Sequence, residues 1–442
     1  MCFAVFEAQT KRQPTDRVYL SVDATPRPAQ FSETMADRQA IVMPNPAPFQ
    51  KYRLEEGYNL SALNIGNFDG KWSLPLDIRR IGLDQTSSEC ALKQLGQVLN
   101  DPELGLENCL VVNTVDNGYA NVPFLCTSYE EHENLVTIAR LKRGSKTFSQ
   151  AEPPADGSYQ NRYYGRPNFN ILESDVKSYK KPKSEDRYEV VRPSISEITP
   201  DETISMTRKM GQRQREVSVQ IERFNDRLLS RKTGFSMKDK PVDILRIQYR
   251  DGKTGEPIYK HEMYLVISGQ SRRQVTTSEA QRAYLSRSDI ESYFRTAKRS
   301  FLLDKFQSSN DQHLDNYNLI VQLASWMSYQ TAGEATLCIA PWERYLPIVK
   351  KAQAAQLAQE NNQKQRKQNG QGGQQRQQIT TLRQTLRLTM SQSIRAAAGY
   401  YATLDLRLFR PPKSPGGTGR QKGQLQTKRI RYKRVKKRAV KG

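Results

Sequence analysis

The chain has 442 residues, and its 69 Lys and Arg exceed its 46 Asp and Glu by 23 charges. Twelve of the cations lie in residues 411–442, where there is no acidic residue. This excess indicates a polyanion as partner, because Lys and Arg neutralise phosphates and release their counterions. No apolar run approaches the roughly 20 residues of a membrane helix, so the sequence predicts no membrane span.

The five cysteines are far apart, form no CxxC pair, and are accompanied by three histidines in the whole chain. Zinc sites need clustered Cys and His, and disulfide frameworks need paired cysteines. The sequence therefore predicts neither, and it indicates a reducing compartment.

The first third of the chain alternates strand and helix patterns. Val18, Leu20 and Val22 alternate with polar residues, which is typical of a strand, and the Pro-containing stretch 24–28 is expected to end it. The same criteria predict further strands at 38–43, 72–78, 110–115 and 134–141, and helices at 87–100 and 122–129. The order of three strands, helix, strand, helix, strand indicates an α/β fold with a mixed sheet.

Later segments are more varied. Strands are predicted at 242–250 and 261–267, and one long helix at 276–300. A second helix is predicted at 311–330, with its buried side formed by Leu319, Ile320, Leu323, Ala324 and Trp326. A Gln-rich stretch and the basic tail follow.

Four functional side chains share one stripe of the predicted helix 276–300. At 100° per residue, Tyr284, Arg287, Glu291 and Lys298 fall inside one narrow arc. A carboxylate able to bind a divalent metal, flanked by cations able to hold phosphate, is what phosphodiester chemistry requires.

The spacing YxxRxxxExxxxxxK resembles the signature of a class of bacterial insertion-sequence transposases with a ribonuclease H-like DDE catalytic core. Three more stretches resemble that class: Trp72–Leu76, Asn113–Tyr119 and Phe301–Phe306. The resemblance implies that Asp23, Asp116 and Glu291 are the catalytic carboxylates and hold two Mg²⁺ ions, for which Mn²⁺ can substitute. It assigns DNA phosphate contacts to Tyr284, Arg287 and Lys298.

The resemblance also implies an activity. Such a protein cleaves double-stranded DNA at transposon ends and joins the 3′ ends to target DNA, as a homodimer on DNA, in the cytoplasm of a prokaryotic cell where the nucleoid lies. Members carry a helical DNA-recognition domain before the first Asp. Here 22 residues precede Asp23, so that domain is expected to be missing.

These inferences divide the chain. We expect residues 1–143 to form the first part of a ribonuclease H-like core, 144–276 an inserted and mainly β subdomain, and 277–345 the catalytic and closing helices. Residues 346–380 are expected to be a Gln-rich linker or helix, 381–410 a helical segment, and 411–442 a disordered basic tail that binds DNA.

Simpler interpretations of the site remain open. Arg287 and Glu291 can form an ordinary i,i+4 pair, and Asp23 and Asp116 can belong to turns. Asp37 is a rival acid, although it suits an ion pair with Arg38 better. The Tyr and Arg residues at 159–166 can stack bases or pack on the insertion.

Two other functions also remain open. One is a catalytically inactive, truncated transposase remnant that binds DNA. The other is a structure-selective nuclease on the same fold.

Overall fold

The structure is a computed structural model of the whole chain. It describes residues 17–30, 37–44, 52–66, 72–142, 145–150, 195–210, 215–229, 232–306 and 310–331, with three short strands between 168 and 192 and the single residues 32, 35, 308 and 394. The predictions for 159–166, 346–380 and 411–442, and for all of 381–410 except Ile394, lie outside the described residues.

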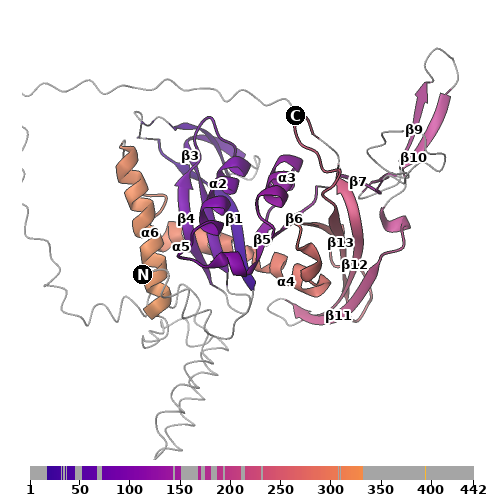
Figure 1. Cartoon of the computed structure of the whole chain (residues 1–442). Helices are drawn as coiled ribbons and strands as arrows, with labels where there is room; N and C mark the ends of the chain where they lie inside the picture. Colours follow the sequence, from indigo (N-terminus) through magenta and orange to yellow (C-terminus); the bar gives the residue numbers. More distant parts are fainter. Residues whose placement is uncertain are drawn as a thin grey trace, which may run out of the picture.

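A mixed sheet forms the centre of the fold (Figure 1). Its central strand β1 pairs in parallel with β5, which pairs in parallel with β6. On the other side β1 is antiparallel to β3, which also pairs with β2 and β4. The bounds are β1 Arg17–Pro28, β2 Gln39–Pro44, β3 Tyr52–Gly66, β4 Ser73–Arg80, β5 Leu110–Val115 and β6 Leu135–Arg140. The predicted α/β class with a mixed sheet is confirmed.

The strands of the segment 144–276 continue this sheet. Strand β14 is antiparallel to β6, and β13, β12 and then β7 and β8 follow it, with β11 beside β12. Strands β9 and β10 form a separate two-stranded sheet. The bounds are β7 Lys146–Phe148, β8 Asn168–Asn170, β9 Asp175–Lys180, β10 Arg187–Arg192, β11 Glu202–Met210, β12 Arg215–Leu229, β13 Val242–Asp251 and β14 Met263–Ser268. The described part of 144–276 is mainly β.

Helices cover both faces of the central strands (Figure 1). The capping box of Thr86 and Glu89 starts α2, and the Asn121 side chain caps α3. The bounds are α2 Ser87–Leu99, α3 Val122–Glu131, α4 Thr277–Ser286, α5 Ser288–Ser300 and α6 Asp311–Thr331, with short 3₁₀ turns η1 Leu106–Asn108, η2 Ile195–Glu197 and η3 Arg272–Gln274. None of the helices in the described part of the chain is long and apolar enough to cross a lipid bilayer.

Strand β1 separates the two helical layers. Its even-numbered residues Val18, Leu20 and Val22 are buried in the core that also holds residues of α2 and α3. Its odd-numbered residues Tyr19 and Asp23 contact α4 and the α4–α5 junction. Because successive side chains of a strand point to opposite faces, one strand packs the core and also presents polar groups to α4 and α5.

The predicted end of β1 at residues 24–28 is wrong. The strand continues to Pro28, with Pro26 opposite Asn59 and Pro28 opposite Gly57 of β3. Pairing with β5 has already ended at Val22. Proline is tolerated here because this half of β1 pairs with β3 and no longer with β5. The N–H that a proline lacks therefore breaks no hydrogen bond to β5.

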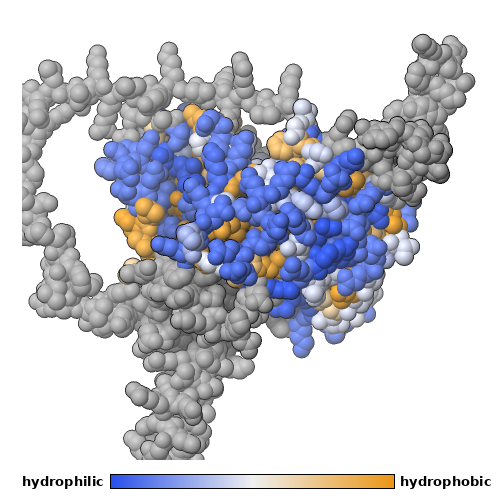
Figure 2. All heavy atoms as spheres, in the orientation of Figure 1, coloured by the Kyte–Doolittle hydropathy of each residue, from blue (hydrophilic) through white to orange (hydrophobic). Residues whose placement is uncertain are grey.

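The predicted buried face of the last helix is also wrong in part. In α6, Trp326 is buried, but Leu319, Ile320 and Leu323 are 46–58% exposed. The helix packs on β4 through Trp326, whose Nε1 donates to the Pro75 carbonyl oxygen at 2.7 Å, and Leu314 and Val321 are buried as well. Figure 2 shows hydrophobic residues on the surface where α6 lies.

Gly269 directly follows β14, and both its backbone conformation and its surroundings favour glycine. Its φ is +140°, and a Cβ there would lie 2.3 Å from the carbonyl oxygen of Leu135. We predict that Gly269→Ala lowers the free energy of unfolding by about 1–3 kcal/mol, because it adds backbone strain and a clash. Urea unfolding measures this. Gly118→Ala is the control, because no heavy atom lies within 4 Å of its added Cβ. Equal stability of the two variants would contradict the prediction.

Candidate active site

The parallel pairing of β1 and β5 brings two predicted carboxylates together. The last registered pair is Val22 with Val115, and Asp23 and Asp116 are the next residue on each strand. Carboxyl ends of adjacent parallel strands meet at one edge of a sheet, where α/β proteins commonly bind ligands. Asp23 is inside β1, so the alternative of a turn-capping residue is wrong for this position.

The predicted helix 276–300 is two helices that meet at Arg287. Helix α4 ends at Ser286 and α5 starts at Ser288. The backbone N–H of Arg287 donates to Tyr284 at 3.2 Å, an i to i−3 bond that tightens the turn. The dihedral angles of Arg287 remain helical, at φ −52° and ψ −33°. The functional stripe is therefore kept across the break.

Arg287 lies between the side chains that were predicted to act together. Its Nη2 donates to Oε1 of Glu291 at 2.9 Å, and its Nη1 is 3.6 Å from Oδ2 of Asp23. Its guanidinium carbon is 5.7 Å from the ring centroid of Tyr284. The i,i+4 pair with Glu291 is thus present, but Arg287 also joins α5 to β1, which a solvated helix face would not do.

The electrostatics place Asp116 in the same group. Burial of Arg287 lowers its pKa, but the charges of Tyr284, Asp116, Asp23 and Glu291 leave it above its ordinary value. The Arg287 and Asp23 side chains are 13% and 22% exposed, whereas Glu291 is 53% exposed. Two acids, Asp23 of β1 and Glu291 of α5, therefore contact one half-buried cation, with Glu291 at the solvent side and Asp116 near enough to affect the pKa of Arg287.

Burial is also the largest influence on Asp23, and it raises the pKa of this carboxyl to about 6. The N–H of Ala24 and the charge of Arg287 lower the pKa, and the charges of Asp116 and Glu291 raise it. An acid held in this way is easily neutralised by a proton and favours a nearby cation.

Lys298 lies in α5 and contacts β1. Its Nζ donates to Oγ1 of Thr25 at 2.7 Å and to the carbonyl oxygen of Pro26 at 3.1 Å. Burial lowers the pKa of Lys298 below its ordinary value, and the charge of Asp304 offsets part of this effect. In this structure Lys298 fixes α5 against the strand that carries Asp23, and its predicted DNA contact stays a prediction.

Tyr119 belongs to the neighbourhood of the two aspartates, although sequence analysis gave it no role. It is 4% exposed, and its hydroxyl has no hydrogen-bond partner among the residues that the structure describes. Burial raises its pKa, and so do the charges of Asp23 and Asp116. The available signal was its place three residues after Asp116 in the stretch Asn113–Tyr119.

The rival acid Asp37 pairs elsewhere. Its Oδ2 is 2.5 Å from Nη1 of Arg80, while Arg38 pairs with Glu56. The predicted Asp37–Arg38 pair is therefore wrong, and a structural role for Asp37 is supported.

The donor set of Asp23, Asp116 and Glu291 fits Mg²⁺ by chemistry, since hard carboxylate oxygens are its preferred ligands. Among the described residues, no three Asp, Glu, His or Cys side chains are close enough to hold one metal ion together. Because Arg287 contacts two of the three acids, metal binding would require this guanidinium to withdraw.

Comparisons with known proteins add little. No protein-family model and no curated protein sequence matches the chain. Among solved structures it is similar to a piggyBac transposase synaptic complex with hairpin DNA, at 10% identity and a TM-score of 0.31. The match covers 93% of this chain, which spans 61% of the piggyBac chain's length. At this level of similarity, fold and function must be argued from the residues themselves.

The raised pKa of Asp23 predicts a pH dependence of the metal-free protein. With a folded pKa of about 6 against an ordinary 3.8, protonated Asp23 contributes stability that is fully present below about pH 4 and lost as the pH rises through about 6. Asp23→Asn should therefore gain stability over wild type across this window, by up to about 1.4 kcal/mol for each unit of the shift.

Urea unfolding in EDTA at pH 4 to 7 measures this difference. Glu103→Gln, at an exposed site, should keep the wild-type profile. A constant difference between Asp23→Asn and wild type at every pH would contradict the predicted pKa.

Proposed function

We propose that this protein is a metal-dependent DNA-processing enzyme of the DDE transposase class with a ribonuclease H-like core. The proposal depends chiefly on one observation: Arg287 contacts both Asp23 of β1 and Glu291 of α5, and Asp116 follows β5 at the edge of the sheet where Asp23 lies. The chain order of strands and helices agrees with the sequence resemblance. On that basis the reaction is cleavage at transposon ends and joining of 3′ ends to target DNA.

In this proposal Asp23, Asp116 and Glu291 hold two Mg²⁺ ions. Bound Mg²⁺ activates a water or a 3′-OH and stabilises the leaving oxygen of the phosphodiester. Asp23 and Asp116 lie where the paired strands β1 and β5 stop pairing, so the sheet holds the backbone of both residues in place. Glu291 approaches from a helix and is more exposed, so it is the ligand best placed to adjust.

Arg287 and Tyr284 are the candidate phosphate contacts. A guanidinium can bind two phosphate oxygens at once, which positions a strand without selecting a base. Because Arg287 already holds Asp23 and Glu291, it can exchange carboxylates for phosphate when metal ions neutralise the acids. The nearby Tyr284 ring gives the guanidinium a surface to lie on.

The partner is proposed to be double-stranded DNA. The excess of 23 positive charges supplies a sequence-independent attraction, and the basic segment 411–442 carries 12 of the cations. Assembly as a homodimer on DNA, and action in a prokaryotic cytoplasm, belong to the same proposal through the sequence resemblance.

We predict that Glu291→Gln abolishes Mg²⁺-dependent nicking of DNA that carries the element's ends. The loss of one ligand charge should lower the rate by at least about a hundredfold, while DNA binding changes little. Asp289→Asn, in the same first turn of α5, is the matched control and should keep at least half of the activity. Gel assays with Mg²⁺ or Mn²⁺ measure both variants.

Equal nicking by wild type and Glu291→Gln would remove Glu291 from the proposed ligands. Tight DNA binding by wild type with no nicking under any metal would instead favour the inactive remnant. Nicking of flaps or hairpins without joining would favour the structure-selective nuclease.

Arg287→Met should have opposite effects on two measurements. Removing the cation that holds Asp23 and Glu291 should tighten Mn²⁺ binding several-fold, since the metal no longer competes with a guanidinium. It should lower the nicking rate about tenfold or more, since a phosphate contact is lost. Calorimetry with Mn²⁺ and nicking assays test the two effects. Arg299→Met, exposed on the same helix, should change neither, and weaker Mn²⁺ binding by Arg287→Met would contradict the prediction.

A further inference from the structure

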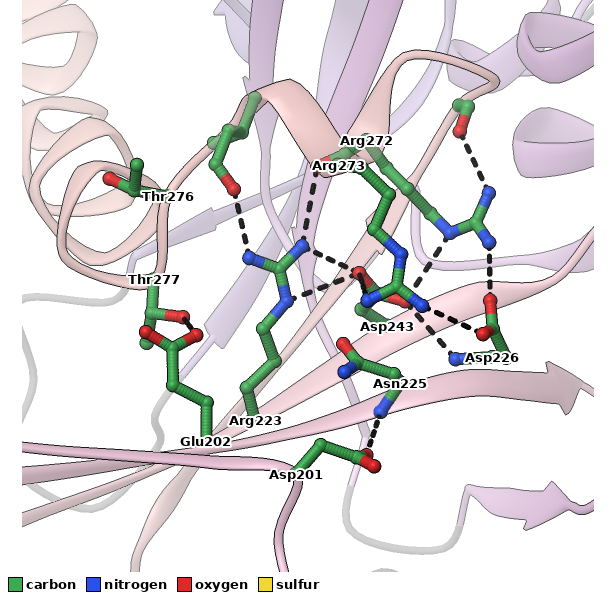
Figure 3. Close-up of polar contacts among 12 residues, drawn as sticks. Asp201, Glu202, Arg223, Asn225, Asp226, Asp243, Arg272, Arg273, Thr276 and Thr277 are labelled. Carbon is green, nitrogen blue, oxygen red and sulfur yellow. Dashed lines mark hydrogen bonds and ion pairs between the residues drawn. The ribbon is translucent and has the colours of Figure 1, made fainter.

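An ion cluster with a buried centre and an exposed edge connects the strands of the inserted segment to the start of α4 (Figure 3). Its members are Arg223, Asp226, Asp243, Arg272 and Arg273, and we name it the Asp243 cluster. The Asp243 side chain in β13 is fully buried. Its Oδ2 accepts from Arg223 at 2.5 Å and 3.1 Å, and its Oδ1 accepts from Arg272 at 3.3 Å.

Arg223 of β12 connects this carboxylate to the loop before α4. Its Nη1 donates to the carbonyl oxygen of Val275 at 2.8 Å, and its Nη2 to that of Arg272 at 3.3 Å. Val275 immediately precedes Thr276, the residue that caps α4. One guanidinium thus fixes the backbone at the point where the helix begins.

A β-bulge supplies the second acid of the cluster. The register of β12 shifts between Phe224 and Arg227, and Asp226 has a φ of +53°. The backbone N–H of Asp226 donates to Asp243 at 3.1 Å, and its carboxylate accepts from Arg272 at 2.5 Å and from Arg273 at 2.7 Å. Bulges re-aim side chains in this way.

Two more contacts fix the same helix end. Thr277 Oγ1 donates to Glu202 of β11, and Glu279 accepts from Arg17 and Tyr19 of β1. The first turn of α4 is therefore held between the inserted strands on one side and β1 on the other. Strand β1 also carries Asp23, the carboxylate that faces Arg287.

Stability alone does not explain three arginines and two aspartates in this place. Well-packed apolar residues often stabilise a core as much as buried ion pairs do, because charges lose hydration on burial. Directed bonds from a guanidinium to two carbonyl oxygens set position and orientation as well as contact. Because a helix is rigid, fixing the start of α4 also fixes where its end lies. Thr276 and Arg287 are 11 residues apart, or about 16 Å at 1.5 Å per residue.

We propose that Arg223 and Asp243 are positioning residues for the active site. Through the inserted strands they fix the start of α4, which carries Tyr284 and leads through Arg287 into α5, where Glu291 lies. Neither residue touches the proposed DNA or metal ions. The proposal rests on the proposed function, because it takes these three side chains as members of the active site.

The test is the combined substitution Arg223→Met with Asp243→Leu. It removes one charge of each sign, so the net charge is unchanged. The Met and Leu side chains fill the space with apolar groups. We expect a folded protein with DNA affinity within about threefold of wild type. Mn²⁺ binding should weaken about ten- to a hundredfold, as when groups that orient metal ligands are lost. Nicking at saturating DNA should fall by a similar factor with little change in KM.

Hydrogen exchange gives a readout that does not depend on activity. Amides of residues 277–291 should exchange at least about tenfold faster in the variant, because the helix start is released. If the double variant does not fold, Arg223→Lys replaces it. A lysine keeps the charge but cannot bond both carbonyl oxygens and Asp243 together. Mn²⁺ binding should therefore be weaker than in wild type, and the amides of residues 277–291 should exchange faster.

The matched control is Arg246→Met with Glu262→Leu. Arg246 lies in β13 and Glu262 directly precedes β14, with Nε to Oε2 at 2.6 Å. In the described part of the chain, neither side chain bonds to the loop before α4. It should leave Mn²⁺ affinity and the exchange of 277–291 unchanged.

Unchanged Mn²⁺ affinity and unchanged exchange in the Arg223 and Asp243 variants would overturn the proposal. Equal effects in the control pair would also overturn it, since they would show general loosening of the sheet. If wild type neither nicks DNA nor binds Mn²⁺ through Glu291, the proposed function fails. In that case, the exchange of 277–291 still decides whether the cluster positions the helices.

Discussion

The parallel pairing of β1 with β5 is the constraint on which the rest of the site depends. It places Asp23 and Asp116 at the same level, one residue past the last registered pair Val22 and Val115. Every other candidate group is then brought to that point by a helix that packs on β1. Tyr19 bonds to α4, Asp23 faces the α4–α5 junction, and Thr25 accepts from α5. Alternation along one strand thus aligns a helix pair with a pair of acids.

The local patterns of the site could be predicted from sequence because each depends on few neighbours. The spacing of Tyr284, Arg287 and Glu291 is set by helical periodicity, which survives the break at Arg287 because its dihedral angles stay helical. The position of Asp116 follows from the end of β5, whereas Asp23 lies inside β1, at the point where its pairing with β5 stops. Whether these residues act as proposed stays a prediction. The contact of Lys298 with Thr25 could not be foreseen, since it depends on the packing of α5 on β1.

The missed strands have different physical causes. Strand β3 has charged residues near its start, and its later part Leu60–Ile65 is buried at every position, so no clear alternation appears. In β12, the alternation of Val217, Val219 and Ile221 is present, but it lies in a charged stretch for which no individual strand was predicted. The misassigned face of α6 has a third cause. The helix has apolar residues on several sides, and the packing of α6 on β4 determines which of them are buried.

The continuity of the sheet from β6 into β14 affects how the protein can move. Subdomains joined by a flexible linker can rotate as rigid bodies, with a hinge of a few residues taking up the change. Here the ladder Arg140–Leu265 to Thr137–Ser268 joins the two parts by backbone hydrogen bonds. A rotation between them would have to shear or break that ladder, so a change of angle is far more costly than twisting of the whole sheet. Substrate-driven motion in the described part of this molecule should therefore be sought in helices and loops, with the sheet as the fixed frame.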